Sequence, residues 1–181
     1  MWVFFKPDLM KKIFLILFSI ISTFAFAQQK QAPSIALPDT AWFNFWAGDW
    51  DVYFFGKDSV KEFGENHIHR ILGDKVLQEE FRVTSGPTKG YEGKSWSVYT
   101  RGKWYQTWVD NAAAYLPFTG RLDGEKRIFE QEFTGKDGKK VIQRMVFSNI
   151  TPNSFKWDWE SSKDEGKTWT NMWELFYTRK K

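Results

Sequence analysis

The sequence predicts an all-β protein, built as one antiparallel up-and-down β-barrel of about eight to ten strands. Three observations lead to this class. Short runs rich in β-branched and aromatic residues recur along the chain, and Gly, Asp, Asn and Pro separate them. No segment beyond Trp46 keeps for long the apolar period of 3.6 residues that an amphipathic helix requires. The 18 phenylalanines and 11 tryptophans are enough large rings to fill a small barrel or to line a pocket inside it.

Ten strands are predicted, and turn-forming residues occupy the connections between them. The strands are Asp49–Phe55, Asn66–Leu72, Lys75–Thr84, Lys94–Thr100, Lys103–Asp110, Ala114–Leu122, Lys126–Thr134, Lys140–Ser148, Ser154–Ser161 and Thr168–Arg179. Because most connections are short, consecutive strands should pair as an antiparallel meander, whose stable forms are an up-and-down barrel or a sandwich. A short helical turn over residues 41–46, capped by Asp39 or Thr40, is expected before the first strand.

The N-terminus has the three-part layout of a secretory signal peptide. Lys11 and Lys12 form a positive segment, and an apolar run follows over residues 13–21. Ala25 and Ala27 are the small residues that a signal peptidase reads. Because the apolar run is too short for a stable membrane span, we expect cleavage after Ala27. The product is an exported protein, periplasmic or secreted, with no stable membrane span after cleavage; an uncleaved anchor is the alternative.

The chain divides into three predicted segments. Residues 1–27 are the signal peptide, and Met10, directly before the two lysines, is a candidate for the true start. Residues 28–38 are polar and proline-bearing, so we expect a flexible arm. Residues 39–181 form the barrel domain. The 154 residues that remain after cleavage are enough for one such domain, which would bury roughly 70% of the surface of its unfolded chain.

Charge and cysteine content exclude several classes of function. The net charge of +4 owes much to Lys6, Lys11 and Lys12 in the expected signal peptide, so a nucleic-acid partner is not expected. The absence of cysteine excludes disulfides, thiol catalysis and thiolate metal ligands. The sequence contains no Gly-rich phosphate loop and no nucleophile elbow, and we expect no cofactor.

The two ends of the predicted domain carry a barrel-closing pair. Gly48-Asp49-Trp50 opens the first strand, and Arg179 ends the last one. This arrangement resembles the lipocalin-like barrels, in which a Gly-x-Trp begins the first strand and an arginine of the last strand packs over the indole at the closed end. Because first and last strands must pair to close a barrel, we expect the Arg179 guanidinium within about 6 Å of the Trp50 ring centroid. Gly48, Trp50 and Arg179 are then structural residues.

Three longer runs resemble the DUF1579 type of exported bacterial domain. They are Phe45–Val52, Lys103–Asp110 and Asp164–Trp169, and the similarity spans nearly all of the chain after the signal peptide. The resemblance implies a lipocalin-like barrel and no particular reaction, since the family is named for its unknown function. Glu165 stands where a glycine is expected and Thr100 where an aspartate is expected, both in predicted turns.

Residues 162–169 also fit the Asp-box pattern S-x-D-x-G-x-T-W, which recurs on the blades of sialidase propellers. One copy cannot make a propeller, which needs several four-stranded blades, so we interpret the motif as structural. We expect Asp164 to accept backbone N–H bonds, Gly166 to adopt a positive φ, and Trp169 to cover the turn.

The predicted hairpin of Lys94–Asp110 supplies the best candidate for the wall of a pocket. With Arg101-Gly102 as a two-residue turn, Thr100 faces Lys103, which fixes the pairing of the two strands. Alternation then gathers hydroxyl, amide and indole groups on one face, which would point inward around a ligand. This face holds Ser95, Ser97, Tyr99, Trp104, Gln106 and Trp108, with Asp110 in line. The alternatives turn the face to solvent, or slip the register by one residue and exchange the two faces.

Four further residues inside the predicted strands are candidates for a functional role. Arg144 and Glu80 lie mid-strand and are candidates for polar anchors in the cavity, although such residues more often belong to the solvated face. His67 and His69 share one face of a strand and could contribute to a metal or haem site, but no third ligand cluster is evident.

The sequence therefore favours an exported barrel that binds a small hydrophobic or amphipathic molecule. The ligand would stack on Trp104 and Trp108, and the polar residues of that face, together with Arg144, would orient it. The runner-up is a cofactor-independent isomerase or lyase that uses a buried Glu80 or Asp110 as acid or base. A carbohydrate-binding module with an exposed aromatic platform is the third hypothesis.

Overall fold

The computed structural model describes residues 38–181. The expected signal peptide, its cleavage site and residues 28–37 of the expected arm lie outside the described residues. Within residues 38–181, no helix has the length and apolar character needed to cross a membrane.

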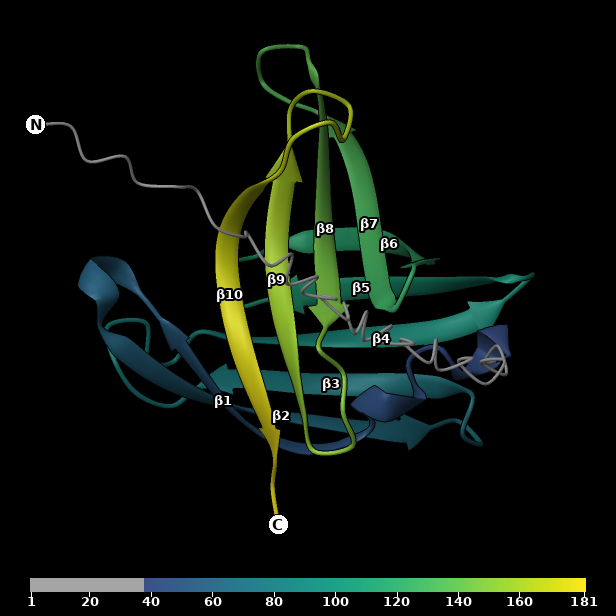
Figure 1. Cartoon of the computed structure of the whole chain (residues 1–181), viewed down its shortest axis with the longest axis vertical. Helices are drawn as coiled ribbons and strands as arrows, with labels where there is room; N and C mark the ends of the chain where they lie inside the picture. Colours follow the sequence, from purple (N-terminus) through teal and green to yellow (C-terminus); the bar gives the residue numbers. More distant parts are fainter. Residues whose placement is uncertain (1–37) are drawn as a thin grey trace, which may run out of the picture. The chain divides into compact units, whose positions relative to one another are not determined.

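Ten antiparallel strands form one closed barrel (Figure 1). They are β1 (Gly48–Phe55), β2 (Lys61–Ile71), β3 (Val76–Val83), β4 (Glu92–Thr100), β5 (Lys103–Asp110), β6 (Tyr115–Asp123), β7 (Lys126–Thr134), β8 (Lys140–Ser148), β9 (Ser154–Ser162) and β10 (Thr170–Arg179). Each strand pairs with its neighbours in sequence, and β1 pairs with β10. The predicted up-and-down barrel is confirmed. β2 begins earlier than predicted, directly after a short 3-10 turn, η3 (Lys57–Ser59).

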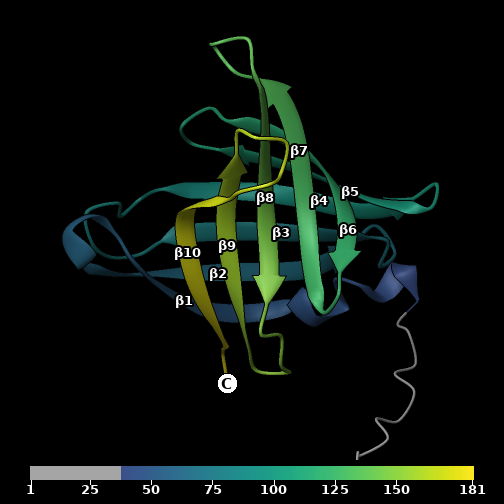
Figure 2. The same ribbon diagram turned by 45° about the horizontal axis from the view of Figure 1, so that its top comes forward.

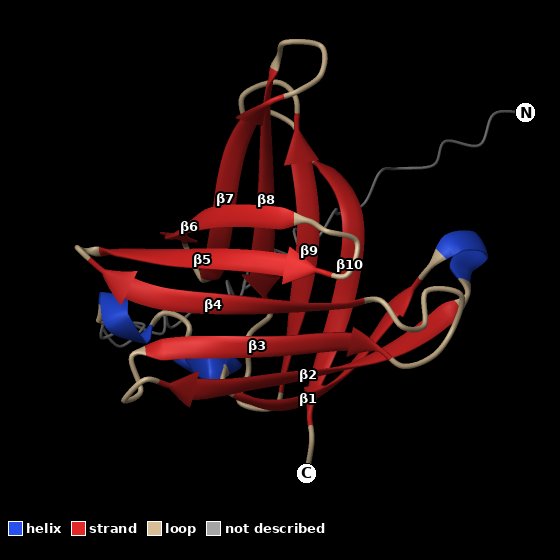
Figure 3. Cartoon of the chain, turned by 180° about the vertical axis from the view of Figure 1, so that it is seen from behind, coloured by secondary structure: helices blue, strands red, loops and turns tan. Residues whose placement is uncertain are grey.

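The strands run in two groups that cross at a steep angle. In Figure 1, β7 to β10 run vertically in front of β2 to β6, which lie across them. Figure 2 and the reverse view in Figure 3 show the same crossing from other directions. Because side chains alternate along each strand, every second residue of both groups points into the space between them.

A short plug closes one end of the barrel. It consists of η1 (Asp39–Ala41) and η2 (Asn44–Trp46), which precede β1. Phe43 and Trp46 are fully buried, and the Phe43 ring stacks on Phe129 with 4.2 Å between centroids. Neither turn has a side-chain cap, so the predicted capping by Asp39 or Thr40 is wrong. The Asp39 side chain instead accepts a hydrogen bond from the Tyr99 hydroxyl at 3.4 Å.

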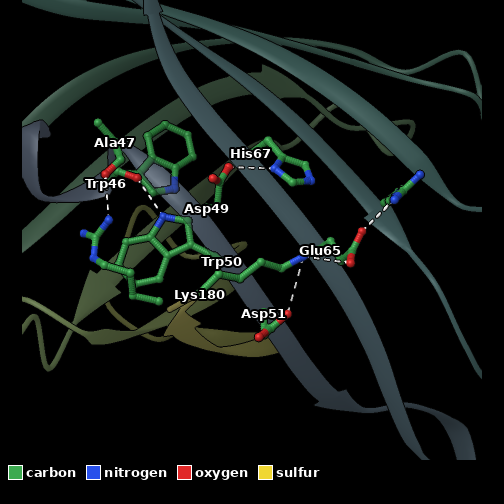
Figure 4. Close-up of polar contacts among 10 residues, drawn as sticks. Trp46, Ala47, Asp49, Trp50, Asp51, Glu65, His67 and Lys180 are labelled. Atoms are coloured by element: carbon green, nitrogen blue, oxygen red, sulfur yellow. Dashed lines mark hydrogen bonds and ion pairs between the residues drawn. The ribbon is translucent and has the colours of Figure 1, made fainter.

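The predicted contact between the first and last strands is present at this plugged end (Figure 4). Trp50 pairs with Arg179 across β1 and β10, and the guanidinium carbon lies 4.0 Å from the indole centroid. Such a cation–π contact contributes about 0.5–2 kcal/mol, with the larger values where the groups are desolvated, and Trp50 is fully buried. The Trp50 indole N–H also donates to the carbonyl oxygen of Trp46 at 2.8 Å, which ties the plug to β1.

Arg179 also holds the backbone of the plug and of a neighbouring turn. Its nitrogens donate to the carbonyl oxygens of Phe45 and Ala47, each at 2.9 Å, and of Pro152 at 2.8 Å. Gly48 makes this approach possible, because a Cβ built there would lie 2.1 Å from Nη1 of Arg179. Gly48 also has a φ of 133°, which L side chains rarely adopt.

Gly48→Ala should therefore lower the free energy of unfolding by about 1–3 kcal/mol, the range for forcing a side chain into a disfavoured backbone region. The added methyl group would also displace an arginine held by three hydrogen bonds. Urea unfolding followed by tryptophan fluorescence measures the loss. Gly73→Ala is the matched control, since Gly73 has a positive φ of 67° but nothing within 4 Å of an added Cβ. Equal losses in the two variants would contradict a role for the Arg179 contact.

Candidate functional site

The β4–β5 hairpin has the predicted register, and the predicted face points into the barrel. Thr100 faces Lys103 across the Arg101-Gly102 turn. Both turn residues have positive φ, 51° and 77°, as a two-residue hairpin turn of the primed type requires. The inward set Ser95, Ser97, Trp104 and Gln106 is buried, whereas Trp96 and Tyr105 on the other face are 39% and 38% exposed.

The barrel contains a cavity of about 100 Å³ toward the end opposite the plug, which we call the far end. Aromatic side chains and two carboxylates surround it. Its lining residues are Glu79, Phe81, Tyr91, Trp108, Asp110, Leu116, Met145, Trp157, Trp159, Trp173, Leu175 and Tyr177. Several of the lining rings are only partly buried, and the cavity is partly open to solvent.

Of the residues predicted to bind a ligand, Trp108 and Asp110 line this cavity. The Trp108 indole lies against β4 where Gly93 has no side chain, since a Cβ at Gly93 would fall 2.1 Å from the ring. Trp104 lies closer to the plug: its N–H donates to the Asp39 carbonyl oxygen at 2.7 Å, and its ring meets Phe43 edge-on. Trp104 and Tyr99 therefore pack at the closed end rather than at the cavity.

Arg144 and Glu80 lie outside the cavity. Arg144 pairs with Glu160 at 2.6 Å, and its guanidinium stacks on Trp169 at 3.5 Å from the ring centroid. Glu80 is 40% exposed and pairs with Lys94 at 3.2 Å. The expectation of a buried Glu80 is wrong because its neighbours in β3, Glu79 and Phe81, occupy the inward positions of the alternation.

Glu79 is the buried carboxylate of the cavity, and sequence reasoning did not select it. Its Oε1 accepts a hydrogen bond from the Asn66 amide at 2.7 Å, and its Oε2 accepts one from the Ser95 hydroxyl at 2.6 Å. Ser95 in turn accepts from the amide of Gln106 at 3.2 Å, and Gln106 also donates to Ser97 at 3.0 Å. The polar face predicted for the hairpin thus forms a hydrogen-bond network that ends at Glu79.

Burial raises the pKa of Glu79 to about 7, because the hydrogen bonds from Ser95 and Asn66 only partly offset the loss of hydration. No lysine, arginine or histidine is among its hydrogen-bond or ion-pair partners in residues 38–181. Near neutral pH this carboxyl group can therefore change its charge inside an aromatic cavity, which is the property of a binding or acid–base group.

Asp110, the second carboxylate of the cavity, is ionised and fully bonded. Its Oδ1 accepts from the backbone N–H groups of Ala112 and Ala114, at 2.9 and 3.0 Å. Its Oδ2 accepts from the Tyr91 hydroxyl at 2.9 Å and the Trp108 indole at 3.1 Å. Burial alone would raise the pKa of Asp110, but these four donors outweigh it and lower the pKa below its ordinary value.

Two acceptor atoms in the Glu79 network have no hydrogen-bond partner within the described part of the chain. They are Oδ1 of Asn66 and Oε1 of Gln106, both on fully buried side chains. An unpaired buried acceptor destabilises a fold by about 1–3 kcal/mol unless a ligand or water supplies a donor. The network is therefore richer in acceptors than the protein itself satisfies.

The three tryptophans contributed by β9 and β10 were also not assigned to the site from sequence. Trp157 and Trp159 stack with 6.4 Å between ring centroids, and Trp173 meets Trp157 edge-on. The alternation of Phe155, Trp157 and Trp159 marks one inward face of β9, and this signal was available in the sequence.

The Asp-box segment forms a compact turn between β9 and β10. Asp164 accepts the backbone N–H of Thr168 at 2.9 Å and its hydroxyl at 2.6 Å. Gly166 has a φ of 85°, and the Trp169 indole donates to its carbonyl oxygen at 3.0 Å. Glu165 adopts a φ of 61°, a left-handed conformation that glycine adopts more readily than other residues.

The two histidines occupy the outer face of β2. His67 pairs with Asp49 at 2.7 Å, on the side of β1 that also carries the Lys180–Asp51 and Lys180–Glu65 ion pairs (Figure 4). His69 shares this face, because it is two residues further along the strand. Neither histidine points into the cavity.

The stability of the protein should fall as pH rises from about 4.5 to about 7, because the folded protein holds the Glu79 proton more tightly than the unfolded chain. The difference between these two pKa values corresponds to roughly 3 kcal/mol. Glu79→Gln, which stays neutral, should remove this dependence and unfold at higher urea than the wild type at pH 8. Glu80→Gln, one residue away on the outer face, should keep the wild-type slope. If the free energy of unfolding of all three proteins varied with pH in the same way, the assignment of this pH dependence to Glu79 would be refuted.

No model of a protein family matches the chain, and no curated protein matches it in sequence. The resemblance to the DUF1579 type therefore gains no support from a family model. Among solved structures, the chain is similar to a redesigned β-barrel at 12% identity and a TM-score of 0.43. That similarity covers 80% of this chain and 98% of the redesigned barrel.

Proposed function

We propose that the protein is an exported, lipocalin-like barrel that binds a small, partly apolar molecule in its far-end cavity. The observation that carries the proposal is the combination of aromatic walls with one buried carboxylate that has no cationic partner among residues 38–181. A barrel that served only as a scaffold would gain stability from an apolar residue at position 79. The buried Glu79 is better explained by a ligand.

The walls favour the apolar part of such a ligand. Trp108, Trp157, Trp159 and Trp173 bring indole rings from β5, β9 and β10 to one space. Each large ring can bury about 150–250 Å² of surface, and ring contacts add about 0.5–1.5 kcal/mol beyond that burial. A flat or chain-like apolar group therefore gains contacts on several sides.

The cavity volume sets the size of the ligand. About 100 Å³ is well below the roughly 300–1,000 Å³ of pockets for drug-sized molecules. The proposed ligand is therefore a molecule with few heavy atoms, or the narrow end of a longer one.

An isomerase or lyase is the second candidate, and the pKa of Glu79 favours it. A carboxyl group with a pKa of about 7 is well matched to general acid–base catalysis at neutral pH. In that case Glu79→Gln would abolish turnover while leaving substrate bound. In a binding protein, the same variant would instead lose affinity for the ligand, and the wild type would show no turnover.

The carbohydrate-binding hypothesis is not favoured. It requires a flat row of solvent-facing aromatic rings. Among residues 38–181, Trp96 is the only tryptophan with an exposed side chain, whereas the cavity tryptophans point inward.

Trp108→Leu should weaken binding of benzyl alcohol, a small neutral probe with an apolar ring, by about 1–3 kcal/mol, because it removes a wall of the cavity. Ligand-observed NMR titration measures the affinity. Trp96→Leu is the control, since Trp96 lies on the outer face of the same hairpin. Native mass spectrometry of protein purified from its own cell envelope should in addition reveal a retained small molecule. Equal affinities of both variants and the wild type would argue against this cavity as the site.

Export is tested separately. N-terminal sequencing of the mature protein should begin at Gln28, as the Ala25-Phe26-Ala27 site predicts. A mature protein that begins well upstream of Gln28 would contradict the predicted cleavage.

A further inference from the structure

We propose that the molecule bound in the cavity is a small primary amine in its protonated form, with its ammonium group beside Glu79 and its apolar body against the indoles. This inference rests on the proposed function and adds the charge and donor chemistry of the ligand. It follows from three features of the cavity, namely its charge, the free lone pairs of Glu79 and the aromatic faces, and from the unpaired acceptors in the hydrogen-bond network of Glu79.

The charge of the cavity is negative. Both ionisable carboxyl groups that line it, Glu79 and Asp110, carry negative charge when ionised, and none of its lining residues is a lysine, arginine or histidine. An anionic ligand would meet repulsion without a cationic partner, and a neutral ligand would leave the ionised form of Glu79 without a counter-charge. A cation supplies the partner that the described residues do not.

Glu79 is the carboxylate that can contact the ligand directly. Each of its oxygens accepts one hydrogen bond from the protein, so each keeps a further lone pair for a donor. Asp110 accepts two bonds at each oxygen and contributes through its charge instead. The ammonium position is therefore set by Glu79, and Asp110 strengthens the field there.

The aromatic walls suit a cation more than an uncharged group. The faces of Trp, Tyr and Phe rings carry negative electrostatic potential, so a cation near them is attracted, most strongly where water is excluded. Trp157 and Trp159 present stacked rings on one side, and Phe81 and Trp173 meet edge-on beside them.

The unpaired acceptors select N–H donors. Oδ1 of Asn66 belongs to the side chain that already bonds Glu79, and Oε1 of Gln106 lies one hydrogen bond further along the same network. Neither Asn66 nor Gln106 is among the residues that line the cavity, so a donor in the cavity would reach these oxygens through water. A primary ammonium has three N–H donors and no acceptor, so it matches such an acceptor-rich network. A quaternary ammonium has no such donor and should bind less well.

The decisive comparison uses three probes of similar shape and different charge: benzylamine, benzyl alcohol and benzoate. At pH 8 the wild-type protein should bind benzylamine at least about tenfold more tightly than benzyl alcohol, and benzoate most weakly. Isothermal titration and ligand-observed NMR measure the three affinities. Tetramethylammonium serves as the cation without N–H donors and should bind more weakly than benzylamine.

The pH dependence of the wild type tests Glu79 without any mutation. Benzylamine stays protonated from pH 5.5 to pH 8, whereas Glu79 loses its proton near pH 7. Affinity for benzylamine should therefore rise by at least about tenfold over this range, while affinity for benzyl alcohol should stay flat or fall. A neutral ligand that accepts a hydrogen bond from protonated Glu79 would show the opposite trend.

The variants locate the effect. Glu79→Gln should reduce benzylamine affinity toward the level of benzyl alcohol and remove its pH dependence, and Trp108→Leu should weaken the binding of both probes. Glu80→Gln, the adjacent carboxylate on the outer face, should bind as the wild type does and so excludes surface attraction. Should Glu79→Gln fail to fold, the wild-type pH profile decides the question.

The outcomes separate the two proposals. Binding of benzyl alcohol or benzoate at least as tight as that of benzylamine, with dependence on Trp108, would overturn the amine inference and leave the binding function standing. Absence of Trp108-dependent binding for all probes would overturn both. Benzylamine binding that Glu80→Gln abolishes and Glu79→Gln preserves would also overturn the amine inference.

Discussion

Closure of the barrel depends on the pairing of its first and last strands. One contact between two stacked side chains, Trp50 and Arg179, stabilises this pairing. Trp50 faces Arg179 across β1 and β10, and the guanidinium that covers the indole also holds the backbone of the plug. A closed barrel has no free strand edge, so its closure fixes for every strand which side chains point inward. The contact between Trp50 and Arg179 therefore holds the plug at one end of the barrel. Because the plug fills that end, the cavity lies toward the other end.

The sequence contained enough information to predict the strands and the inward face of the hairpin, because turn chemistry is local. Arg101-Gly102 admits a two-residue turn, and this sets the register of β4 and β5. The position of the cavity could not be predicted, because it depends on Phe43 filling the space beside Trp104, a contact between distant parts of the chain. The prediction that Glu80, rather than Glu79, is the buried carboxylate was wrong for a different reason. Both positions hold the same residue type, so only the parity of the strand distinguishes them.

The surroundings of Glu79 lower the stability of the fold, and the proposed binding would offset that loss. An apolar side chain at this position would remove the cost of burying a carboxyl group and of leaving neighbouring acceptors unpaired. Groups that lower stability but suit a ligand are characteristic of binding sites, where the ligand restores what folding lost. The rest of the interior is rich in aromatic contacts, such as that between the Phe129 and Phe147 rings. This packing supplies the stability that offsets the cost of Glu79.

The hydrogen bond from Arg179 to Ala47 joins residues that are 132 positions apart in the chain. Until β10 is in place, a chain in which β1 to β9 have formed cannot close, and it exposes the unpaired edges of β1 and β9 at once. Such edges pair readily with other chains, and folds dominated by distant contacts form slowly. The protein is therefore most prone to aggregate late in folding, immediately before the final strand pairs with β1 and β9.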